Sequence, residues 1–397
     1  MRKPGLSQFS WRKETKMFSE FYPSADKEVR SILKNVKSPS EEKVKDILEK
    51  SKTESLDLPE IAELLETRGD QSFEMMRDFT LENFRGPEGN ELRNISPIYL
   101  SSHCIDKCGY CQFSASRTDT QRTRLSLNQL EREVLSVIDE ENNVIEFTLA
   151  TDPDFTPGKL AEYVNKTKKI LGDRKGSGVL LCSDYLTEED YKNLKEAGLW
   201  GIIQWDETLD RSKYEKWHGQ SPRKKNFEER MDNHDRAAKS GLESATGVLF
   251  GLSDFRYDVL MQIAKARHLH NEYGKRPFVF GTPRLKPIGG KEMHPIDEVD
   301  DRKYETALMV YKIAEPDVAR WLQTREMPEL NFRNMLDGDV YTYRCGEVKP
   351  GGYQVNKSTV NSLKGGQFGV NEMERIDFEE KLKKTNFSVN YSWIGGD

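Results

Sequence analysis

The residues best suited to chemistry are three cysteines within eight positions of one another, Cys104, Cys108 and Cys111. The chain has five cysteines, and the other two, Cys182 and Cys345, stand alone, so the pattern is not a disulfide framework. Because thiolates are soft ligands that select zinc or iron–sulfur clusters, a tight cysteine cluster is typical of a metal site. A structural zinc site needs four ligands, and this C-x3-C-x2-C loop offers three. On a 4Fe-4S cluster, three thiolates would leave one iron open to bind a second molecule and pass it an electron.

Other ligand arrangements stay open from the residues alone. His103 could be a fourth ligand, although the alternation of a strand would point its side chain away from that of Cys104. A zinc knuckle or a chance cluster is the simpler alternative. For Cys182 and Cys345 we expect lone buried thiols.

Short apolar runs alternate with amphipathic helices from about residue 94 onward. The predicted strands are 97–102, 144–150, 178–183, 200–205, 244–250, 277–282, 318–323 and 340–344. Three helices are predicted between the strands. One spans 127–140 and begins with a capping box of Ser126 and Gln129; a second spans 187–197, is capped by Thr187 and ends at Gly198; a third spans 256–273. Seven or eight β-α units in series predict an α/β fold with parallel strands inside and helices outside, a full or partial (β/α) barrel of the TIM type.

Such a barrel carries its chemistry at the carboxyl ends of its strands. The cysteine loop follows the first predicted strand. Polar segments follow five others, namely 151–153, 206–208, GLSD (251–254), PRLKP (283–287) and TRE (324–326). Six such loops on one rim indicate a single functional site.

Residues 1–94 are expected to form a helical extension. Three capping residues each precede an apolar pattern of helical spacing: Ser24, Ser40 and Asp57. We expect Gly69 and then Gly86-Pro87 to end the last of these helices. The predicted domains are this extension, which covers the catalytic domain, a barrel over 95–345, and a segment over 346–397 that packs on the barrel. A separate helical domain with its own partner is the alternative for 1–94.

Composition indicates a globular enzyme with a heavily charged surface. The 397 residues are 36% hydrophobic and 32% charged, and no apolar run is long enough to cross a bilayer. The net charge of −6 gives no general electrostatic reason to bind nucleic acid or an anionic membrane. The first residues, MRKPGLSQFSWRKETK, lack the apolar stretch of a secretory signal, so we expect a cytoplasmic protein with reduced thiols.

Several motifs carry a resemblance to a known family. They are PIYLSSHCIDKCGYCQFSASR (97–117), KNFEERMDNHDRAAKSGL (225–242), GVLFGLSD (247–254), PRLKP (283–287), TRE (324–326) and KPGGY (349–353). With these motifs the chain, from about Pro97 to its end, resembles the aromatic amino-acid lyases of the radical S-adenosylmethionine (SAM) superfamily. It looks most like the tyrosine lyases of thiamine biosynthesis (2-iminoacetate synthases) and is also similar to the 3-methyl-2-indolic acid synthases.

The resemblance implies two cofactors, a 4Fe-4S cluster and SAM. In such enzymes SAM chelates the open iron through its amino and carboxylate groups, and one electron then splits it to a 5′-deoxyadenosyl radical. The family pattern assigns cluster binding to the three cysteines of the loop. It places Tyr110 near the adenine, and Gly247 and Gly251 where the backbone packs on that ring.

Two loops depart from the family pattern. Where close relatives have Thr-Gly-Glu, this chain has Thr151-Asp152-Pro153. Asp152 could still accept a hydrogen bond from the SAM ammonium. The alternative is that Asp152 only caps the following helix. Where relatives have Gln-Glu-Thr-Tyr-His, this chain keeps Glu207 within the sequence 206–210. Glu207 is expected near the SAM ribose or sulfonium, the alternative being an ion pair with a nearby arginine.

The resemblance also implies residues for the substrate. Arg325 matches the arginine aimed at the substrate carboxylate, and Tyr99 matches the tyrosine beside the substrate amine, so both are our catalytic candidates. Arg284 is a further candidate, for SAM or substrate, and Thr342 and Tyr343 complete the expected pocket. A structural ion pair is the alternative for either arginine.

The implied activity is hydrogen abstraction from the amine of a free aromatic amino acid, followed by cleavage at Cα. For tyrosine this yields 2-iminoacetate (dehydroglycine) and p-cresol. A tryptophan-type lyase, another radical SAM enzyme of amino-acid carbon skeletons, and a non-catalytic iron–sulfur or metal-binding protein are the alternatives. The hydrogenase-maturase branch is disfavoured, because too few cysteines follow Cys111 for a second cluster. The expected partners are the small-molecule substrate, a flavodoxin or ferredoxin reductant and a thiazole synthase.

Overall fold

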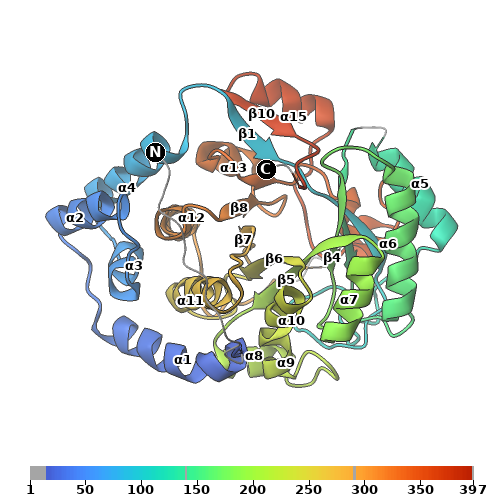
Figure 1. The fold of residues 1–397 in the computed structure, drawn as a ribbon, viewed down its shortest axis with the longest axis horizontal. Coiled ribbons are helices and arrows are strands. Elements are labelled where there is room, and N and C mark those ends of the chain that lie inside the picture. Colours follow the sequence, from blue (N-terminus) through green and yellow to red (C-terminus); the bar gives the residue numbers. More distant parts are fainter. Residues whose placement is uncertain (1–14, 139–140, 289–291, 396–397) are drawn as a thin grey trace, which may run out of the picture.

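One curled parallel sheet organises the molecule (Figure 1). The computed structural model describes residues 15–138, 141–288 and 292–395. Within them the sheet has ten strands in the order β10-β1-β9-β8-β7-β6-β5-β4-β3-β2. The strands are β1 (Asn90–Arg93), β2 (Ser96–Ser101), β3 (Val144–Leu149), β4 (Gly178–Cys182), β5 (Leu199–Glu207), β6 (Glu243–Val248), β7 (Val279–Gly281), β8 (Ala319–Leu322), β9 (Val340–Tyr341) and β10 (Phe387–Asn390).

The predicted fold is confirmed in its partial form. All eight predicted strands exist, as β2 to β9, and every pairing is parallel. Among the described residues no pairing joins β2 to β10, so the barrel is open. The sequence analysis missed β1 and β10, which pair with each other at the edge of the sheet and lie outside the segment 95–345.

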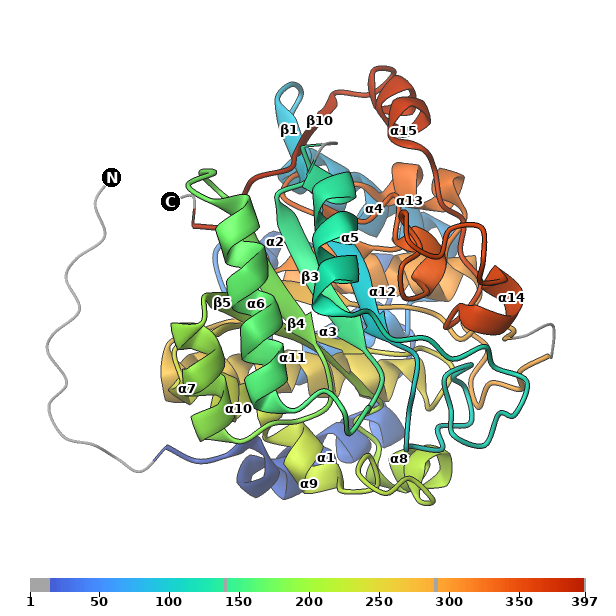
Figure 2. The same ribbon diagram turned by 90° about the vertical axis from the view of Figure 1, so that its right-hand side faces the viewer.

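Helices cover the outer face of the sheet. They are α5 (Leu127–Ile138), α6 (Pro157–Leu171), α7 (Glu188–Glu196), α8 (Arg211–His218), α9 (Phe227–Met231), α10 (Asn233–Lys239), α11 (Phe255–Tyr273), α12 (Asp301–Ala314) and α13 (Pro328–Asn334). The tail adds the 3-10 helix η1 (Gly346–Val348), α14 (Ser362–Gly365) and α15 (Arg375–Leu382). Figure 2 shows α5 and α6 packed side by side in front of β3 and β4.

The three predicted barrel helices are present, and the two with a predicted capping residue begin where it placed them. Ser126 and Gln129 exchange both hydrogen bonds of the capping box, at 2.8 and 3.3 Å, and the Thr187 side chain accepts from the backbone N–H of Asp190. Residues 139–140 of the first predicted helix lie outside the described residues. Local hydrogen bonding at the first turn therefore determined where these helices begin.

Four further helices precede the sheet: α1 (Phe18–Asn35), α2 (Glu41–Ser51), α3 (Leu58–Leu65) and α4 (Asp70–Phe84). Ser40 and Asp57 cap α2 and α3 as predicted. The prediction that Ser24 caps a helix was wrong, because α1 begins six residues earlier, at Phe18. Ser24 lies inside this helix, and the buried side chains of α1 continue past it to Ala25. The prediction for Gly69 was also wrong, since this residue precedes α4 as its N-cap and ends no helix.

The N-terminal helices pack on the outside of α11 and α12 (Figure 1). Their buried apolar side chains, among them Phe18, Ile61 and Met76, belong to one hydrophobic cluster with Leu260 of α11 and Leu308 of α12. A shared core of this kind couples the extension to the barrel. The division of the chain into three domains stays a prediction.

A second cluster closes the barrel interior at the amino ends of the strands. Val144, Leu180 and Ile203 contribute from the sheet, and Trp393 and Ile394 reach in from the C-terminal segment. The interior is therefore filled below and open above, at the carboxyl ends. Among the described residues, every helix is too short or too polar to span a bilayer.

Candidate active site

A cavity opens inside the half-barrel at the carboxyl ends of the strands. Residues of β2, β3, β4, β5 and β8 line it, together with the loop after β2, Thr342 after β9, and residues 367 and 368 of the tail. All five cysteines of the chain are free thiols in its wall. Cys182 and Cys345 were expected to be lone buried thiols, and the structure brings both into the wall of the same cavity.

The cysteine loop is held by polar contacts to its own backbone and to a neighbouring segment. The Arg122 guanidinium donates to the carbonyl of Ser114 at 2.7 Å, and the Asp106 carboxylate accepts the backbone N–H groups of Arg223 and Lys224 at 3.0 and 3.1 Å. Figure 2 shows the loop, in teal, between α8 and α14. A loop fixed at both ends presents its thiols in a defined arrangement before any cofactor binds.

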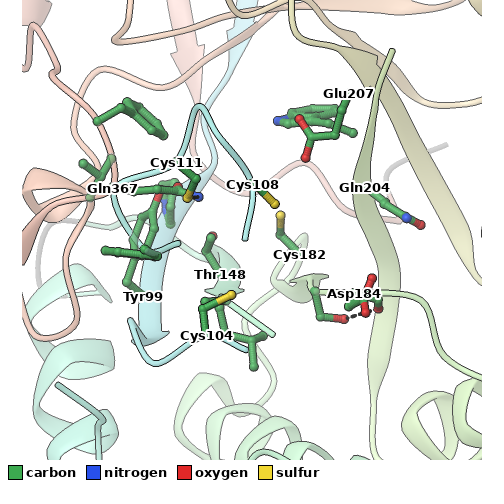
Figure 3. Close-up of a pocket in the computed structure, with 18 of the residues that line it drawn as sticks. Tyr99, Cys104, Cys108, Cys111, Thr148, Cys182, Asp184, Gln204, Glu207 and Gln367 are labelled. Atoms are coloured by element: carbon green, nitrogen blue, oxygen red, sulfur yellow. Dashed lines mark hydrogen bonds between the residues drawn. The ribbon is translucent and has the colours of Figure 1, made fainter. Parts of the chain in front are cut away.

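The thiols of Cys104, Cys108 and Cys111 sit at separate points around the cavity (Figure 3). Among the described residues no three His, Cys, Asp or Glu side chains converge as ligands of a single ion do. In a 4Fe-4S cluster each thiolate binds a different iron, so separate thiols on one wall fit a cluster better than a zinc ion. Backbone N–H of Asp106 donates to Cys104 Sγ at 3.3 Å, a contact that also stabilises a thiolate ligand.

Burial keeps two of these thiols, those of Cys104 and Cys108, protonated in the absence of a metal. It raises the pKa of Cys104 to about 11 and that of Cys108 to about 12. A thiol of this kind loses its proton to a metal ion, whose charge replaces the missing solvation.

Tyr99, Gln367 and Cys111 form a chain of contacts across the cavity wall. The Tyr99 hydroxyl donates to Gln367 Oε1 at 3.0 Å, and Gln367 Nε2 lies 3.7 Å from Cys111 Sγ. Burial raises the pKa of Tyr99 well above its usual range, so the phenol stays neutral. Gln367 belongs to the C-terminal tail, and no sequence signal had pointed to it.

Arg325 extends from the end of β8 into the cavity. Its guanidinium lies 3.6 Å from the ring centroid of Phe368, and one N–H reaches the carbonyl of Arg284 at 3.5 Å. Among the described residues it has no ion-pair partner, and its Nε has no acceptor. A half-buried guanidinium without a carboxylate is suited to bind one from a ligand.

Glu207 lies at the end of β5 beside two cations. Its carboxylate is 3.0 Å from Lys224 Nζ and 3.4 Å from Arg230 Nη2. Burial acts to raise the pKa of Glu207, but the two cations outweigh it and lower the pKa to about 2. Its backbone has φ of 68°, a conformation that costs a non-glycine residue about 1 kcal/mol or more and is often found at functional sites. The ion pair that was considered as the alternative role of Glu207 is thus present at the cavity wall.

Tyr110 also lines the cavity, and its hydroxyl bonds to His218 Nε2 at 2.7 Å. Burial lowers the pKa of His218 to about 3, so the imidazole is neutral. Its Nδ1 donates to the Tyr214 carbonyl at 2.9 Å, which leaves Nε2 to accept from Tyr110. The ring of Tyr110 is thereby fixed against the loop.

Thr342 lines the cavity as well, with its hydroxyl already bonded to Trp321 and to the Ile95 carbonyl. Tyr343 does not; it stacks on Phe378 with ring centroids 4.8 Å apart. Of the two residues expected to complete the pocket, the structure places one at the wall and one in the core.

Four other predicted site residues lie outside the cavity lining. Asp152 is bound by Arg124 at 2.6 and 2.8 Å, and Arg284 is paired with Glu326 and, at 2.9 Å, with Asp301. Gly247 and Gly251 also lie apart from the lining. The contacts with SAM predicted for these four residues stay predictions, and the ion pair considered for Arg284 is present.

The glycine at position 247 has a packing reason in the structure. A Cβ atom there would lie 2.2 Å from Trp205 Cε3 and 2.6 Å from the Gly281 carbonyl oxygen. Trp205 can therefore lie across β6 and β7 into the cavity because both strands carry glycine.

Sequence reasoning missed three polar groups of the cavity on the inner face of the sheet. They are Glu146 and Thr148 of β3 and Cys182 of β4. A polar side chain within an otherwise apolar strand was the available signal. It is ambiguous, because the sequence does not show which face of a strand points inward.

Replacing Glu146 by glutamine is expected to stabilise the protein at alkaline pH. Burial raises the pKa of Glu146 to about 7, although hydrogen bonds from Thr148 and Cys182 oppose the shift. The folded state therefore holds this proton more tightly than the unfolded state, and stability falls as pH rises from about 4.5 to 7. Glu146→Gln should gain about 3 kcal/mol above pH 8 and little below pH 4.5. Urea unfolding of both proteins at pH 4.5, 6 and 8.5 measures the difference; an equal difference at all three pH values would contradict it.

Comparison with known proteins agrees with this arrangement. Residues 98–265 match the Radical SAM superfamily. The chain is 26% identical to the 2-iminoacetate synthase of Escherichia coli over 270 residues, covering 68% of this chain and 70% of that one. It is 25% identical to the same enzyme of Salmonella typhimurium over 274 residues, covering 67% and 69%.

Solved structures match the fold over nearly the whole chain. The FeFe-hydrogenase maturase HydG from Carboxydothermus hydrogenoformans superposes with a TM-score of 0.84 at 23% identity, covering 95% of this chain and 85% of that one. Methylornithine synthase (PylB) superposes with a TM-score of 0.67 at 15% identity, covering 87% and 97%. Members of the superfamily use a 4Fe-4S cluster and SAM, for which the three-thiol wall is suited. Residues 98–265 therefore match a radical SAM domain, and the chain is similar to the 2-iminoacetate synthases.

Proposed function

We propose that this enzyme is a lyase that fragments a free aromatic amino acid, with tyrosine as the substrate and 2-iminoacetate and p-cresol as the products. The observation that carries the proposal is Arg325, a guanidinium in the same cavity as the three thiols that forms no ion pair with any residue in the described part of the chain. The relatives named 2-iminoacetate synthase support the choice of reaction.

Residues of the cavity wall would bind the two cofactors. Cys104, Cys108 and Cys111 hold the cluster, and Tyr110 and Glu207 contact SAM. When bound, the cluster and SAM supply the one-electron chemistry that generates a 5′-deoxyadenosyl radical. The enclosing half-barrel excludes water from this reaction.

Two residues position the amino acid. Arg325 binds its carboxylate, and Tyr99 lies beside the amine from which hydrogen is abstracted. The neutral state of Tyr99 matters here, because a phenolate beside the amine would favour its ammonium form, which has no lone pair to assist the abstraction. Thr342 completes the wall near Trp321.

Feeding the reconstituted enzyme with candidate amino acids tests the proposal. Anaerobic incubation with SAM, dithionite and tyrosine should release p-cresol and glyoxylate, the hydrolysis product of 2-iminoacetate, in step with 5′-deoxyadenosine, all measured by mass spectrometry. Tryptophan in place of tyrosine should give no fragment. Release of an indole product from tryptophan alone would replace the tyrosine assignment by a tryptophan-type lyase, and absence of 5′-deoxyadenosine with every amino acid would refute a lyase.

We propose a flavodoxin or ferredoxin as the natural electron donor, since dithionite is only a chemical substitute. A thiazole synthase is the proposed consumer of the unstable imine product. Replacing dithionite by a reduced flavodoxin in the same assay should sustain turnover.

A further inference from the structure

Helix α1 binds the end of β5 from outside the cavity. We call residues 206–211 the β5 turn; they comprise the last two residues of β5 and the connection to α8, and they include Glu207, whose side chain lies at the cavity wall (Figure 3). Figure 1 shows α1 beside α11 and α8. Among the described residues, none of α1 lines the cavity. The β5 turn therefore joins a residue of the site to a helix outside it.

Two side chains of α1 bind the β5 turn directly. The Tyr22 hydroxyl donates to the Leu209 carbonyl at 2.9 Å and accepts the backbone N–H of Arg211 at 3.3 Å. Arg30 Nη2 lies 3.2 Å from Asp210 Oδ2. Tyr22 is 5% exposed, and it shares a hydrophobic cluster with the fully buried Leu209. Because water has little access to these polar groups, a broken bond there is not readily replaced, and the bonds fix the backbone of the turn.

A buried ion pair holds the β5 turn at its other end. Asp206 Oδ1 is 2.7 Å from Lys265 Nζ of α11, and both side chains are fully buried. The ring of Phe18, the first residue of α1, has its centroid 5.1 Å from the same Nζ atom. Helix α1 thus covers the ion pair, keeps water from weakening it and adds a cation–π contact.

Glu207 lies between these two anchors in a strained backbone conformation. The Thr208 N–H donates to the Asp206 carbonyl at 2.9 Å, which closes a three-residue γ-turn around Glu207. With φ of 68° at its central residue, this is the rare form of the turn, which is strained for a residue with a side chain. Such a conformation persists only where the surrounding structure holds it. The contacts on both sides of Glu207 provide that support.

We propose that α1 positions Glu207 for its contact with SAM, by holding the β5 turn on both sides of this residue. Tyr22 and Arg30 are the positioning residues, and neither lines the cavity. The inference rests on the proposed function in one respect, the contact between Glu207 and SAM. It also gives a physical reason for the departure of 206–210 from the family pattern, since the changed positions 206, 209 and 210 are the ones that contact α1 and α11.

Removing the two direct bonds of α1 is expected to weaken SAM binding about 10-fold. Without them the strained turn relaxes in most molecules, and the apparent dissociation constant rises as the fraction with Glu207 in place falls. The rate at saturating SAM should stay the same, because neither Tyr22 nor Arg30 lines the cavity. A purely structural role would lower the melting temperature and the amount of active protein, but it would leave the KM for SAM unchanged.

The test compares the unmodified enzyme with the double variant Tyr22→Phe/Arg30→Gln, both reconstituted under anaerobic conditions. Titration with SAM, followed by the change in the EPR signal of the reduced cluster, gives the dissociation constant. Formation of 5′-deoxyadenosine without an amino acid gives KM and kcat for SAM. Hydrogen–deuterium exchange of the β5 turn, measured without SAM, reports whether the turn has loosened.

The double variant Tyr163→Phe/Arg333→Gln is the matched control. It also removes one buried tyrosine hydroxyl and one partly exposed arginine, since Tyr163 donates to the Leu125 carbonyl at 2.8 Å and Arg333 pairs with Glu305 at 2.7 Å. Neither bond involves α1 or the β5 turn. Melting temperatures and iron content check the fold and the cluster of each variant.

Weaker SAM binding and a higher KM at unchanged kcat, with faster exchange in the β5 turn and normal values in the control, would support the role of α1. SAM affinity within about twofold of the unmodified enzyme, an equal loss in the control, or lost affinity with unchanged exchange would each overturn it. If the double variant does not fold, Tyr22→Phe alone decides, with an expected loss of about threefold. Weakened SAM binding in the double variant, without p-cresol release by either protein, would refute the lyase and leave the role of α1 intact. Release of p-cresol with unchanged SAM affinity in the double variant would do the reverse.

Discussion

Serine in place of Cys108 is expected to reduce 5′-deoxyadenosine formation at least about 1000-fold and to yield a nearly colourless protein after anaerobic reconstitution. Cys108 is 4% exposed and lines the cavity beside Glu207 and Lys224. A hydroxyl is a harder and far less acidic ligand than a thiol, so one of three cluster attachments is lost. Iron and sulfide content, visible absorbance and product formation measured on the same sample check the result.

Cys345→Ser is the matched control. Cys345 is a buried thiol of the same cavity, but it bonds to Glu372 at 2.9 Å and to Thr324 at 3.4 Å, contacts that a hydroxyl can also make. This variant should keep its cluster and its SAM cleavage. A brown, active Cys108→Ser protein would exclude the proposed ligand set, and a zinc-loaded wild-type protein without iron would exclude the cluster altogether.

Leucine in place of Arg325 is expected to lower kcat/KM for the amino acid about 1000-fold, equivalent to about 4 kcal/mol. The reason is the carboxylate of the substrate, which would enter a wall of low polarity between Phe368 and Tyr99 without its cation. Lysine in its place should recover part of the loss, because it restores the charge but not the two parallel hydrogen bonds of a guanidinium. Steady-state kinetics with tyrosine measures the change.

Cleavage of SAM without substrate provides the internal control for Arg325. The slow formation of 5′-deoxyadenosine in the absence of an amino acid should be the same in Arg325→Leu and in the unmodified enzyme, because the proposed role of Arg325 concerns the amino acid alone. A variant that loses both reactions equally would show that Arg325 acts on the cluster or on SAM. An unchanged kcat/KM would remove it from the substrate site.

The main strands of the barrel could be predicted because each is a short apolar run, and a strand buried on both faces reads that way in any sequence. β1 and β10 could not. They are four-residue strands with the sequences NELR and FSVN, and they form because two segments far apart in the sequence pair with each other at one edge of the sheet. The start of α1 was misplaced for a related reason, since its burial against α11 outweighs the local signal of Ser24.

The cysteine loop could be predicted because its chemistry is local, with three thiols on eight consecutive residues. Arg325 and Tyr99 were accessible from short motifs in the same way, and the structure places both in the wall beside the thiols. The contacts that decide what such residues can do are between distant segments. Asp152 illustrates this, since Arg124 holds it outside the cavity lining.

The sequence by itself thus determined the type of fold, the three thiols and the end of the barrel at which the functional residues lie, because spacing along the chain carries this information. Only the tertiary structure decided which side chains face the interior and which charges are left without partners. Glu146 and Arg325 each have a distinctive environment because strands far apart in the chain curl around one space. Burial and pairing are properties of that enclosed space, and no single stretch of residues contains them.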